Sequence, residues 1–350
     1  MDNTDYSDKN IPVLTVIEHI RKRPAMYIGG LGRRGILSIL KDMLIFSLLS
    51  EKWKTVEISI YKDHFKLKFD AFWFDLTNKN GGYAHLNVGE YNDLAYYEYA
   101  FIIPVALSEK FIIKTQNKEL QFAKGILEKE IDKINSNFEI IFYPDKEFFD
   151  LPTLPYMFLA NELKILSFLN TERKFVLSDE TADIKFDFQS KNGLLDYFHE
   201  QVLGYHTLTN PFIINYQDEK YELEVVFSYY EKDKYFAPQS NGNNNFIACA
   251  NGFHCLTGGS HEKAFFKAIK EINKTFEFSQ KTGIIGVLNL KMHKRILQFQ
   301  GSTKSKLYAP DAEKIITKAI KKAITATLLD NPEKQKEILQ NLSFHRFMKK

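Results

Sequence analysis

The sequence contains few cysteines and no long apolar run. Its two thiols, Cys249 and Cys255, are too few for a disulfide framework, and no cluster of further ligands accompanies them to form a zinc site. The longest nearly apolar stretch, from Met43 to Leu49, is far shorter than the ~20 residues that span a bilayer. The N-terminus is polar and lacks the basic and apolar regions of a signal peptide. These absences predict a cytoplasmic protein with reduced thiols and no membrane span.

Acidic residues are scarce near the C-terminus. Residues 261–350 carry 19 Lys or Arg against 8 Asp or Glu, an excess of 11, although the net charge of the whole chain is only +3. Residues 1–260 therefore carry a net charge of −8. Positive charge gathered in one part of a chain favours contact with a polyanion, and the alternative is a solvated basic helix surface.

Hydrophobic periodicity in the first half mixes helices with alternating strands. Thr15 and Glu18 have the spacing of a capping box, which predicts a helix that Pro24 ends. A second helix, over 36–49, is apolar nearly all round and is expected to be buried. Further elements are expected as strands at 56–61, 65–69, 111–115, 138–143 and 174–177, with a helix at 159–169. The pattern predicts an α+β fold.

A second unit is expected to begin near Pro211. Its expected elements are strands at 222–227, 245–250 and 284–290 and helices at 262–275 and 311–329. A chain of 350 residues has the length of about two domains.

Four strings in one order carry a resemblance to a known family. They are 21–29 (Arg-Lys-Arg-Pro-Ala-Met-Tyr-Ile-Gly), 164–170 (Lys-Ile-Leu-Ser-Phe-Leu-Asn), 251–261 (Asn-Gly-Phe-His-Cys-Leu-Thr-Gly-Gly-Ser-His) and 299–307 (Phe-Gln-Gly-Ser-Thr-Lys-Ser-Lys-Leu). In this order and spacing the chain resembles the N-terminal half of the DNA gyrase and topoisomerase IV B subunits, from about Tyr6 to Leu339.

The resemblance implies a GHKL-type ATPase α/β sandwich followed by a ribosomal-S5-like transducer domain. The implied divisions are an N-terminal arm over 1–12, a degenerate ATPase-like domain over 13–207, the transducer over 208–332 and a tail over 333–350. The chain ends about where that transducer ends, so a metal-binding Toprim domain, and DNA cleavage by this chain alone, are not expected.

The family's catalytic positions are altered. In the family a Glu on the buried helix activates water, and an Asn one turn later holds Mg²⁺. Here these positions fall on Asp42 and Phe46. Asp42 is a shorter base, or alternatively an incidental acidic residue of a buried helix. Phe46 cannot ligate magnesium, which requires oxygen donors.

The adenine-binding motif is altered too. The family's adenine-binding Asp aligns with Ala71, and Asp70 replaces it only after a one-residue slip that turns the side chain to the other face. The motif's glycines align with Phe72 and Phe74 or their neighbours, such as Trp73. Bulky rings in place of glycine suggest a filled pocket. The alternatives are a partner-binding surface and a base-stacking platform.

The phosphate-binding lid has lost its glycines. By the family's spacing, these glycines fall on Leu94, Ala95, Glu98 and Ala100, and Glu98 would place negative charge near a triphosphate. A Thr that contacts nucleotide in the family corresponds to Phe138. The losses agree with one another and predict no bound cofactor and no metal.

Two features of the family persist. Lys304 matches the lysine of a transducer loop that reaches the γ-phosphate, and is otherwise a surface or interdomain lysine. Tyr6, five residues before Ile11, matches the arm that crosses to the other subunit of a dimer, and is otherwise part of a disordered polar terminus.

The helix expected at 311–329 has lysines opposite an apolar stripe. Its stripe is predicted as Ile316, Ile320, Ala323 and Leu328, and its candidate DNA-contact residues are Lys314, Lys318, Lys321 and Lys322. Such lysines suit non-specific phosphate contact.

Together these features favour a binding or regulatory protein that dimerises and contacts double-stranded DNA, a topoisomerase subunit or both. The alternative is an active ATPase that uses Asp42 and Lys304 with ATP and Mg²⁺ and supplies energy to a partner that carries the cleavage domains. Whether the chain is an enzyme is left open, with the non-enzyme hypothesis favoured.

Overall fold

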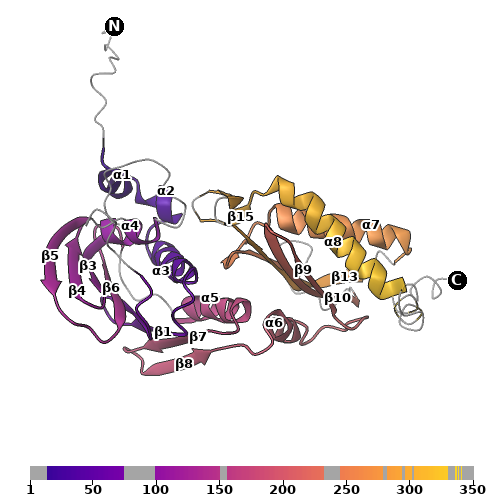
Figure 1. The fold of residues 1–350 in the computed structure, drawn as a ribbon, viewed down its shortest axis with the longest axis horizontal. Coiled ribbons are helices and arrows are strands. Elements are labelled where there is room, and N and C mark those ends of the chain that lie inside the picture. The colour runs from indigo at the N-terminus through magenta and orange to yellow at the C-terminus, as the bar shows by residue number, and fades with distance from the viewer. Residues whose placement is uncertain are drawn as a thin grey trace, which may run out of the picture. The chain divides into compact units, whose positions relative to one another are not determined.

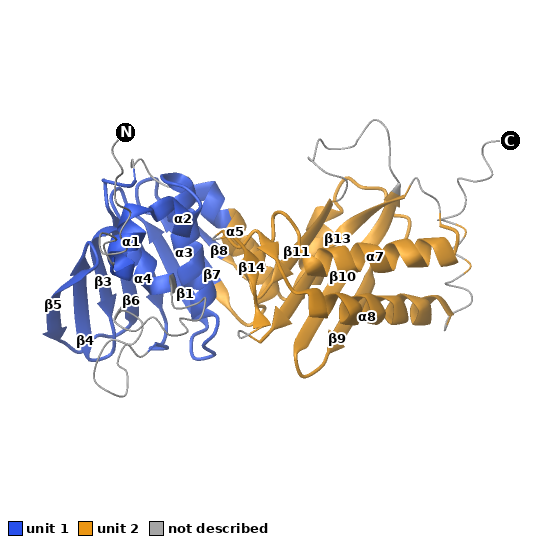
Figure 2. Cartoon of the chain, turned by 90° about the horizontal axis from the view of Figure 1, so that it is seen from above, with its two compact units in different colours: residues 1–160, 175–187 blue, residues 161–174, 188–350 orange. Residues whose placement is uncertain are grey.

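The computed structural model describes residues 14–74, 99–149, 156–231, 245–278, 282–293, 296–301 and 303–329, together with Lys336, Ile338 and Gln340. The chain folds into two compact units (Figure 2). The first comprises residues 1–160 and 175–187, and the second comprises 161–174 and 188–350.

An eight-stranded sheet forms the first unit (Figure 1), in the order β5-β4-β3-β6-β2-β1-β7-β8. Its strands are β1 (Thr55–Ile60), β2 (Phe65–Phe69), β3 (Ser108–Lys114), β4 (Lys118–Ala123), β5 (Ile126–Asp132), β6 (Phe138–Pro144), β7 (Lys174–Asp179) and β8 (Ile184–Phe188). The predicted strands β1 and β2 are present and pair antiparallel, with Val56 opposite Phe69. The sequence analysis missed β4, β5 and β8. Strand β5 is exposed along its whole length and has no clear alternation, whereas β8 alternates apolar and charged residues and was a usable signal.

Alternation along the strands gives this sheet one buried face and one more polar face. In β2, Phe65, Leu67 and Phe69 are buried, whereas Lys66 and Lys68 are half-buried. Alternate side chains of a strand point to opposite faces, so the aromatic and aliphatic residues line the face that carries the core.

The described part of the first unit contains four complete helices. They are α1 (Val16–Lys22), α2 (Pro24–Ile28), α3 (Arg33–Ser47) and α4 (Tyr99–Ala106). The predicted capping box begins α1, where the Glu18 N–H donates to Thr15 Oγ1 at 3.2 Å and the Thr15 N–H donates to Glu18 Oε2 at 2.7 Å. Gly29, with φ of 73°, ends α2. As predicted, α3 is buried over most of its circumference.

A five-stranded sheet forms the core of the second unit, in the order β12-β11-β13-β10-β9. Its strands are β9 (Phe212–Gln217), β10 (Tyr221–Glu231), β11 (Asn245–Ala250), β12 (Phe253–His254) and β13 (Thr282–Met292). The β11–β13 pair is parallel and the other pairs are antiparallel. A short hairpin pairs β14 (Phe299–Gln300) with β15 (Lys306–Leu307).

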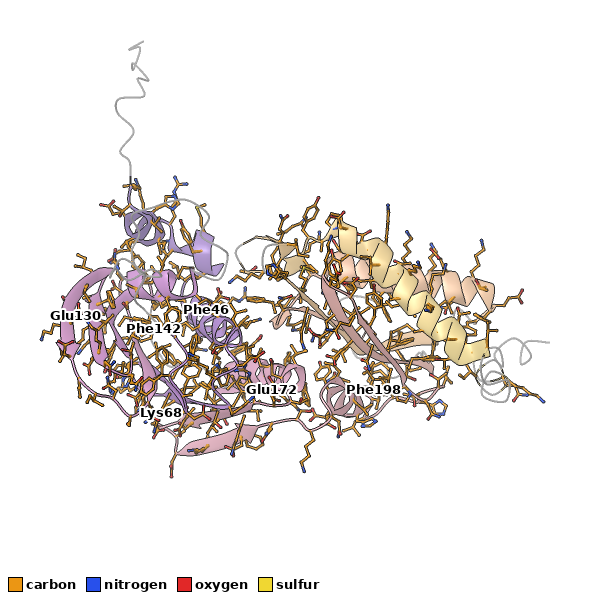
Figure 3. The ribbon with its side chains drawn as sticks, viewed as in Figure 1. Phe46, Lys68, Glu130, Phe142, Glu172 and Phe198 are labelled. Atoms are coloured by element: carbon orange, nitrogen blue, oxygen red, sulfur yellow. The ribbon has the colours of Figure 1, made fainter. Side chains whose placement is uncertain are left out.

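Helices lie on both faces of this second sheet (Figure 1). On one face α7 (Ser260–Thr275) and α8 (Pro310–Leu329) pack side by side, and the Phe265 ring stacks on Phe246 with centroids 4.2 Å apart. On the other face the end of α5 (Tyr156–Leu169) and α6 (Leu194–Gln201) share a core with Val226, Val287 and other sheet residues. Phe198 of this core is labelled in Figure 3.

This second core explains where the compact units divide. Phe168 and Leu169 of α5 and Tyr197 of α6 pack with strands of the second sheet, so residues 161–174 and 188–207 fold with the second unit. The expected domain boundary between residues 207 and 208 rests on the family resemblance and stays a prediction.

Candidate functional site

Asp42 and Phe46 lie one turn apart on α3. A separation of four residues places both side chains on the same side of a helix. Both residues are buried, with 9% and 8% of their surfaces exposed. The helix thus presents a short carboxylate and a phenyl ring at the positions that the resemblance assigns to a catalytic base and a magnesium ligand.

The Phe46 ring (labelled in Figure 3) is surrounded by other rings. It meets Phe101 at 5.4 Å between centroids and Phe74 at 5.5 Å, both edge to face, and it meets Trp73 at 5.9 Å. Edge-to-face and offset pairs at 4.5–7 Å are the favoured aromatic geometries and contribute about 0.5–1.5 kcal/mol each beyond area burial. Phe46 is therefore held as a core residue.

The same group of rings extends to the sheet. Phe74 stacks on Phe101 at 4.8 Å, and Phe138 of β6 lies 5.2 Å from Trp73 and 6.4 Å from Phe74. We call Phe46, Trp73, Phe74, Phe101 and Phe138 the aromatic cluster. Segments far apart in the sequence supply it, namely α3, the residues after β2, α4 and β6.

The aromatic cluster brings together positions that the sequence analysis treated one by one. Phe46 stands at the expected magnesium ligand, Phe74 near an expected glycine and Phe138 at an expected nucleotide-binding Thr. Phe72, which was also expected to fill this region, is half-buried. The contribution of Phe101 was missed, although its place directly after Ala100 in an apolar run was a usable signal.

Asp70 has a structural role directly after β2. Its two carboxylate oxygens accept hydrogen bonds from the backbone N–H groups of Lys54 at 3.0 Å and Thr55 at 2.9 Å, and its own N–H donates to the Thr55 carbonyl at 3.1 Å. These bonds fix the beginning of β1 against the end of β2. A role of Asp70 in nucleotide binding is untested and stays a prediction, and Ala71 beside it is half-buried.

Several expected site residues lie outside the described residues. They are Tyr6 and Ile11 of the arm and Leu94, Ala95 and Glu98 of the lid. Ala100 is described and is buried in the first turn of α4.

Lys304 lies in the loop that joins β14 to β15. Its Nζ sits 4.9 Å from the centroid of the Phe253 ring, within cation–π range, and the residue is buried. Its backbone has a φ of 56°, in the left-handed region. The lysine is therefore anchored within the second unit, and its contact with a phosphate stays a prediction.

The lysines expected to contact DNA line a groove between α7 and α8. This basic groove, of about 490 Å³, is lined by Lys267, Glu271, Lys314, Thr317, Lys318, Lys321, Lys322 and Thr325. The buried stripe of α8 comprises Ala312, Ile316, Thr317, Ile320, Ile324 and Leu328. Ala323, predicted in that stripe, is only half-buried, because the helical repeat brings Ile324 to the core instead.

One lysine of the basic groove is already paired. Lys321 Nζ donates to Glu271 Oε2 at 2.5 Å, and this hydrogen bond lowers the pKa of the Glu271 carboxyl. Lys267 of α7 was not foreseen as a groove residue, since its helix was predicted from periodicity and not from its packing partner. Both helices thus contribute charge to one concave surface.

The glycine turn before α7 is structural. The Ala309 N–H donates to Ser260 Oγ at 2.9 Å, and a side chain at Gly259 would collide with the Leu307 backbone at 2.5 Å. His261 is fully buried, and neither ring nitrogen has a hydrogen-bond partner in the described chain. Burial in these apolar surroundings lowers its pKa to about 3. His261 is a packing residue.

Neither a metal cluster nor a membrane span is found in the part of the chain that the structure describes. No group of three or more His, Cys, Asp or Glu side chains there could hold a metal ion. Likewise, none of the described helices is long and apolar enough to cross a bilayer.

Comparisons with known proteins agree with this architecture. A family model described as DNA gyrase B matches residues 193–347. The chain is 24% identical to the B subunit of DNA topoisomerase 4 from Mycoplasma capricolum, over 97% of this chain and 58% of that protein. It is 23% identical to the B subunit of DNA gyrase from Archaeoglobus fulgidus, over 98% of this chain and 59% of that protein. The chain thus spans under two thirds of the length of these relatives.

Solved structures show the same fold. The 43K ATPase domain of Thermus thermophilus gyrase B, determined in complex with an aminocoumarin, superposes with a TM-score of 0.70 at 19% identity and covers 95% of this chain and 96% of that one. The topoisomerase IV ATP-binding domain of Francisella tularensis superposes with a TM-score of 0.69 at 20% identity, over 95% and 97% of the two chains. Along nearly its whole length, this chain is similar in sequence and in fold to the ATPase and transducer half of the gyrase B and topoisomerase IV B subunits.

Proposed function

We propose that this chain is a gyrase-B-like ATPase and transducer module that has lost ATP hydrolysis and acts as a binding or regulatory protein. Its partners are double-stranded DNA, bound without sequence preference, a topoisomerase subunit, or both. The observation that carries the proposal is the aromatic cluster around Phe46.

Magnesium does not fit the residues present at the expected ligand position. Mg²⁺ requires near-octahedral oxygen ligands, and Phe46 offers a hydrocarbon ring that is packed by three other rings. Opening the aromatic cluster to admit a nucleotide would expose several rings, each of which stabilises the fold by about 1.5–3 kcal/mol through burial. The cost of opening argues against nucleotide binding independently of the missing ligand.

Asp42 alone does not supply an ATPase. A general base must lie within hydrogen-bond reach of the water that it activates. Without a metal ligand one turn away, the water and the phosphate have no fixed position beside the carboxylate.

Nucleotide binding and turnover give the direct test. Calorimetric titration with Mg²⁺ and a non-hydrolysable ATP analogue is expected to show at most weak binding, and phosphate release is expected to stay at background. The Thermus thermophilus gyrase B ATPase domain, in the same assays, controls for conditions. Turnover that disappears in Asp42→Ala would overturn the proposal and support the active ATPase.

The basic groove supports the DNA part of the proposal. Lys314, Lys318 and Lys322 are exposed along one side of α8, opposite its buried stripe. Lysine is a point charge that suits phosphates and carries no base-reading geometry. The expected Kd near physiological salt is therefore about 10⁻⁴–10⁻⁶ M, and log Kobs should fall with log salt by about 0.9 for each phosphate neutralised.

Fluorescence anisotropy with duplex DNA at several salt concentrations tests this part. Triple reversal of Lys318, Lys321 and Lys322 to Glu is expected to abolish binding. A matched reversal of the exposed lysines Lys52, Lys62 and Lys129 in the first unit is expected to weaken it far less. If wild-type affinity is undetectable at low salt, or unchanged by the groove reversal, the DNA part fails and the topoisomerase subunit becomes the proposed partner.

The proposal also includes a cytoplasmic homodimer assembled through the arm that carries Tyr6 and Ile11. The motif spacing of the arm supports it. Sedimentation of the full chain and of a chain that lacks residues 1–10 tests the arm, and equal average masses would remove it from the proposal.

A further inference from the structure

The eight-stranded sheet ends in two edge strands, β5 and β8. Within the described chain, no strand pairs with the outer side of either one. An edge strand presents a row of backbone N–H and C=O groups that can pair with another chain, and proteins usually guard such edges with charge. The two edges of this sheet differ in the charged and apolar residues that oppose or favour pairing with another chain.

The β8 edge exposes apolar side chains on one face. Ile184 is 47% exposed and Phe186 is 59% exposed, although both alternate with charged residues. Lys185 between them forms an ion pair with Glu57 of β1 at 2.8 Å, which places Lys185 on the polar face of the sheet. Ile184 and Phe186 therefore project from the opposite face, the one that carries the core.

The sequence of β8 is complementary to itself in an antiparallel arrangement. When two copies pair about Phe186, each Phe186 lies opposite its counterpart, and Lys185 of one copy lies opposite Asp187 of the other. The two-fold axis creates this opposite-charge pair twice, on the polar face. Directly opposed aromatic pairs and opposite-charge pairs both stabilise antiparallel strands.

We propose that β8 pairs with β8 of a second copy of this chain, antiparallel about Phe186, and joins two eight-stranded sheets into one. The contact is isologous, because the same strand serves both copies. It covers the exposed rings and satisfies the edge backbone groups together.

The β5 edge shows why this pairing is specific. Antiparallel self-pairing about Ile131 would set Glu130 opposite Asp132, and pairing about Lys129 would set Glu128 opposite Glu130. Like charges directly opposite one another destabilise a strand pair. Of the two edges, only β8 has a charge pattern that favours pairing with its own copy.

A cysteine placed on the two-fold axis reports this contact in the full chain. Phe186→Cys would bring two thiols together across an antiparallel pair, where Cα separations of about 4.5–5.5 Å suit a disulfide. Both native cysteines are buried, so the background is low. Mild oxidation is expected to give a disulfide-linked dimer on a non-reducing gel. The matched control, Ile131→Cys on the exposed β5 edge, is expected to stay monomeric on the gel.

Charge reversal in the Phe186→Cys chain separates specific pairing from collision. Lys185→Asp alone and Asp187→Lys alone each create like-charge pairs and are expected to lower the dimer yield several-fold. The double reversal, Lys185→Asp with Asp187→Lys, restores opposite charges and is expected to recover the yield. Circular dichroism melts confirm that each variant is folded. A yield equal to that of the Ile131→Cys control, or the absence of recovery in the double reversal, would overturn the proposal.

Discussion

In the first unit the expected magnesium position lies among aromatic rings, whereas in the second unit the expected DNA-contact lysines lie along an open groove. The aromatic cluster is closed, apolar and held by ring contacts at 4.8–6.4 Å. The basic groove has about 490 Å³ of space and is lined mainly by lysines. The two regions should therefore respond to different perturbations: the cluster to loss of volume, and the groove to salt and to changes of charge.

Under the proposed function, this difference favours the basic groove as the region that faces a ligand. A pocket filled by its own side chains is stabilised as core, so its residues can be explained without any partner. Lysines held on one concave surface repel one another, and an anion between them relieves that repulsion. The contrast favours a function carried by the second unit, with the first unit as a scaffold.

The largest expected effect is on the aromatic cluster. Phe46→Ala removes a ring that three others surround, and it is expected to lower the free energy of unfolding by about 3–5 kcal/mol. Urea denaturation measures this value. Phe158→Ala, at a phenylalanine that is 54% exposed on α5, is the matched control and should change it little. Equal losses in the two variants would show that Phe46 is not core.

The next largest expected effect is a loss of stability of the second unit as the pH falls. Because the pKa of His261 is lowered to about 3 from its ordinary 6.5, the unfolded state binds the proton more tightly than the folded state. The stabilising effect of the neutral buried ring is complete above pH 6.5 and is lost as the pH falls below 6.5 toward 3. The slope in that window is expected to be about 1.4 kcal/mol per pH unit.

Urea denaturation across pH 7 to 4, for the wild type and His261→Leu, checks this dependence. The substitution replaces the unpartnered imidazole with an apolar side chain. It should remove the contribution of one proton from the slope of the free energy of unfolding against pH. His199→Leu, at an exposed histidine of α6, is the control and should leave the profile steep. A profile that is unchanged in His261→Leu would contradict the assignment.

A smaller effect is expected at Asp70. Asp70→Ala removes the acceptor of the Lys54 and Thr55 N–H groups and should cost about 1 kcal/mol, because water replaces part of the lost bonding at this exposed site. Asp70→Asn keeps one acceptor oxygen and should cost less. Asp132→Ala, in a loose surface pair with Lys118 at 3.9 Å, should cost close to nothing in the same urea titration. If Asp70→Ala instead changes nucleotide binding without changing stability, the structural role is wrong.

The sequence predicted the fold well where the hydrophobic pattern was strong. The capping box at Thr15, the buried helix α3 and the alternating strands β1 and β2 were all confirmed. The edge strand β5 was missed because its sequence, exposed along the whole strand, has no period-two pattern, whereas the alternation of Ile184, Phe186 and Phe188 with charged residues in β8 was a usable signal. Hydrophobic periodicity reflects which side chains are buried, and few side chains of an edge strand are buried.

The candidate sites were predictable as positions but not as assemblies. Phe46, Phe74 and Phe138 were each recognised as replacements, yet only the fold shows that they touch the same rings. The α8 lysines were visible from helical spacing, whereas Lys267 and Glu271 join the groove through the packing of α7 beside α8. Contacts between elements distant in the chain depend on tertiary packing, which one-dimensional periodicity does not encode.

The smallest expected effect is at Glu271, the acidic residue of the basic groove. Glu271 accepts from Lys321 at 2.5 Å and neutralises it, so Glu271→Gln should release one positive charge toward a bound phosphate. Because this ion pair is partly exposed and screened by solvent, the gain in duplex DNA affinity should be small, about 2- to 5-fold. The salt slope should also steepen by about 0.9.

The control is Glu277→Gln, at an exposed acidic residue just beyond α7. Anisotropy titrations of this variant and of Glu271→Gln distinguish a local effect from a change in net charge. Both variants gain the same charge, but only Glu271 lies in the groove. Lys321→Gln should also weaken binding less than Lys318→Gln, because Glu271 already holds Lys321. Equal gains in the two glutamine variants would place the DNA somewhere other than between α7 and α8.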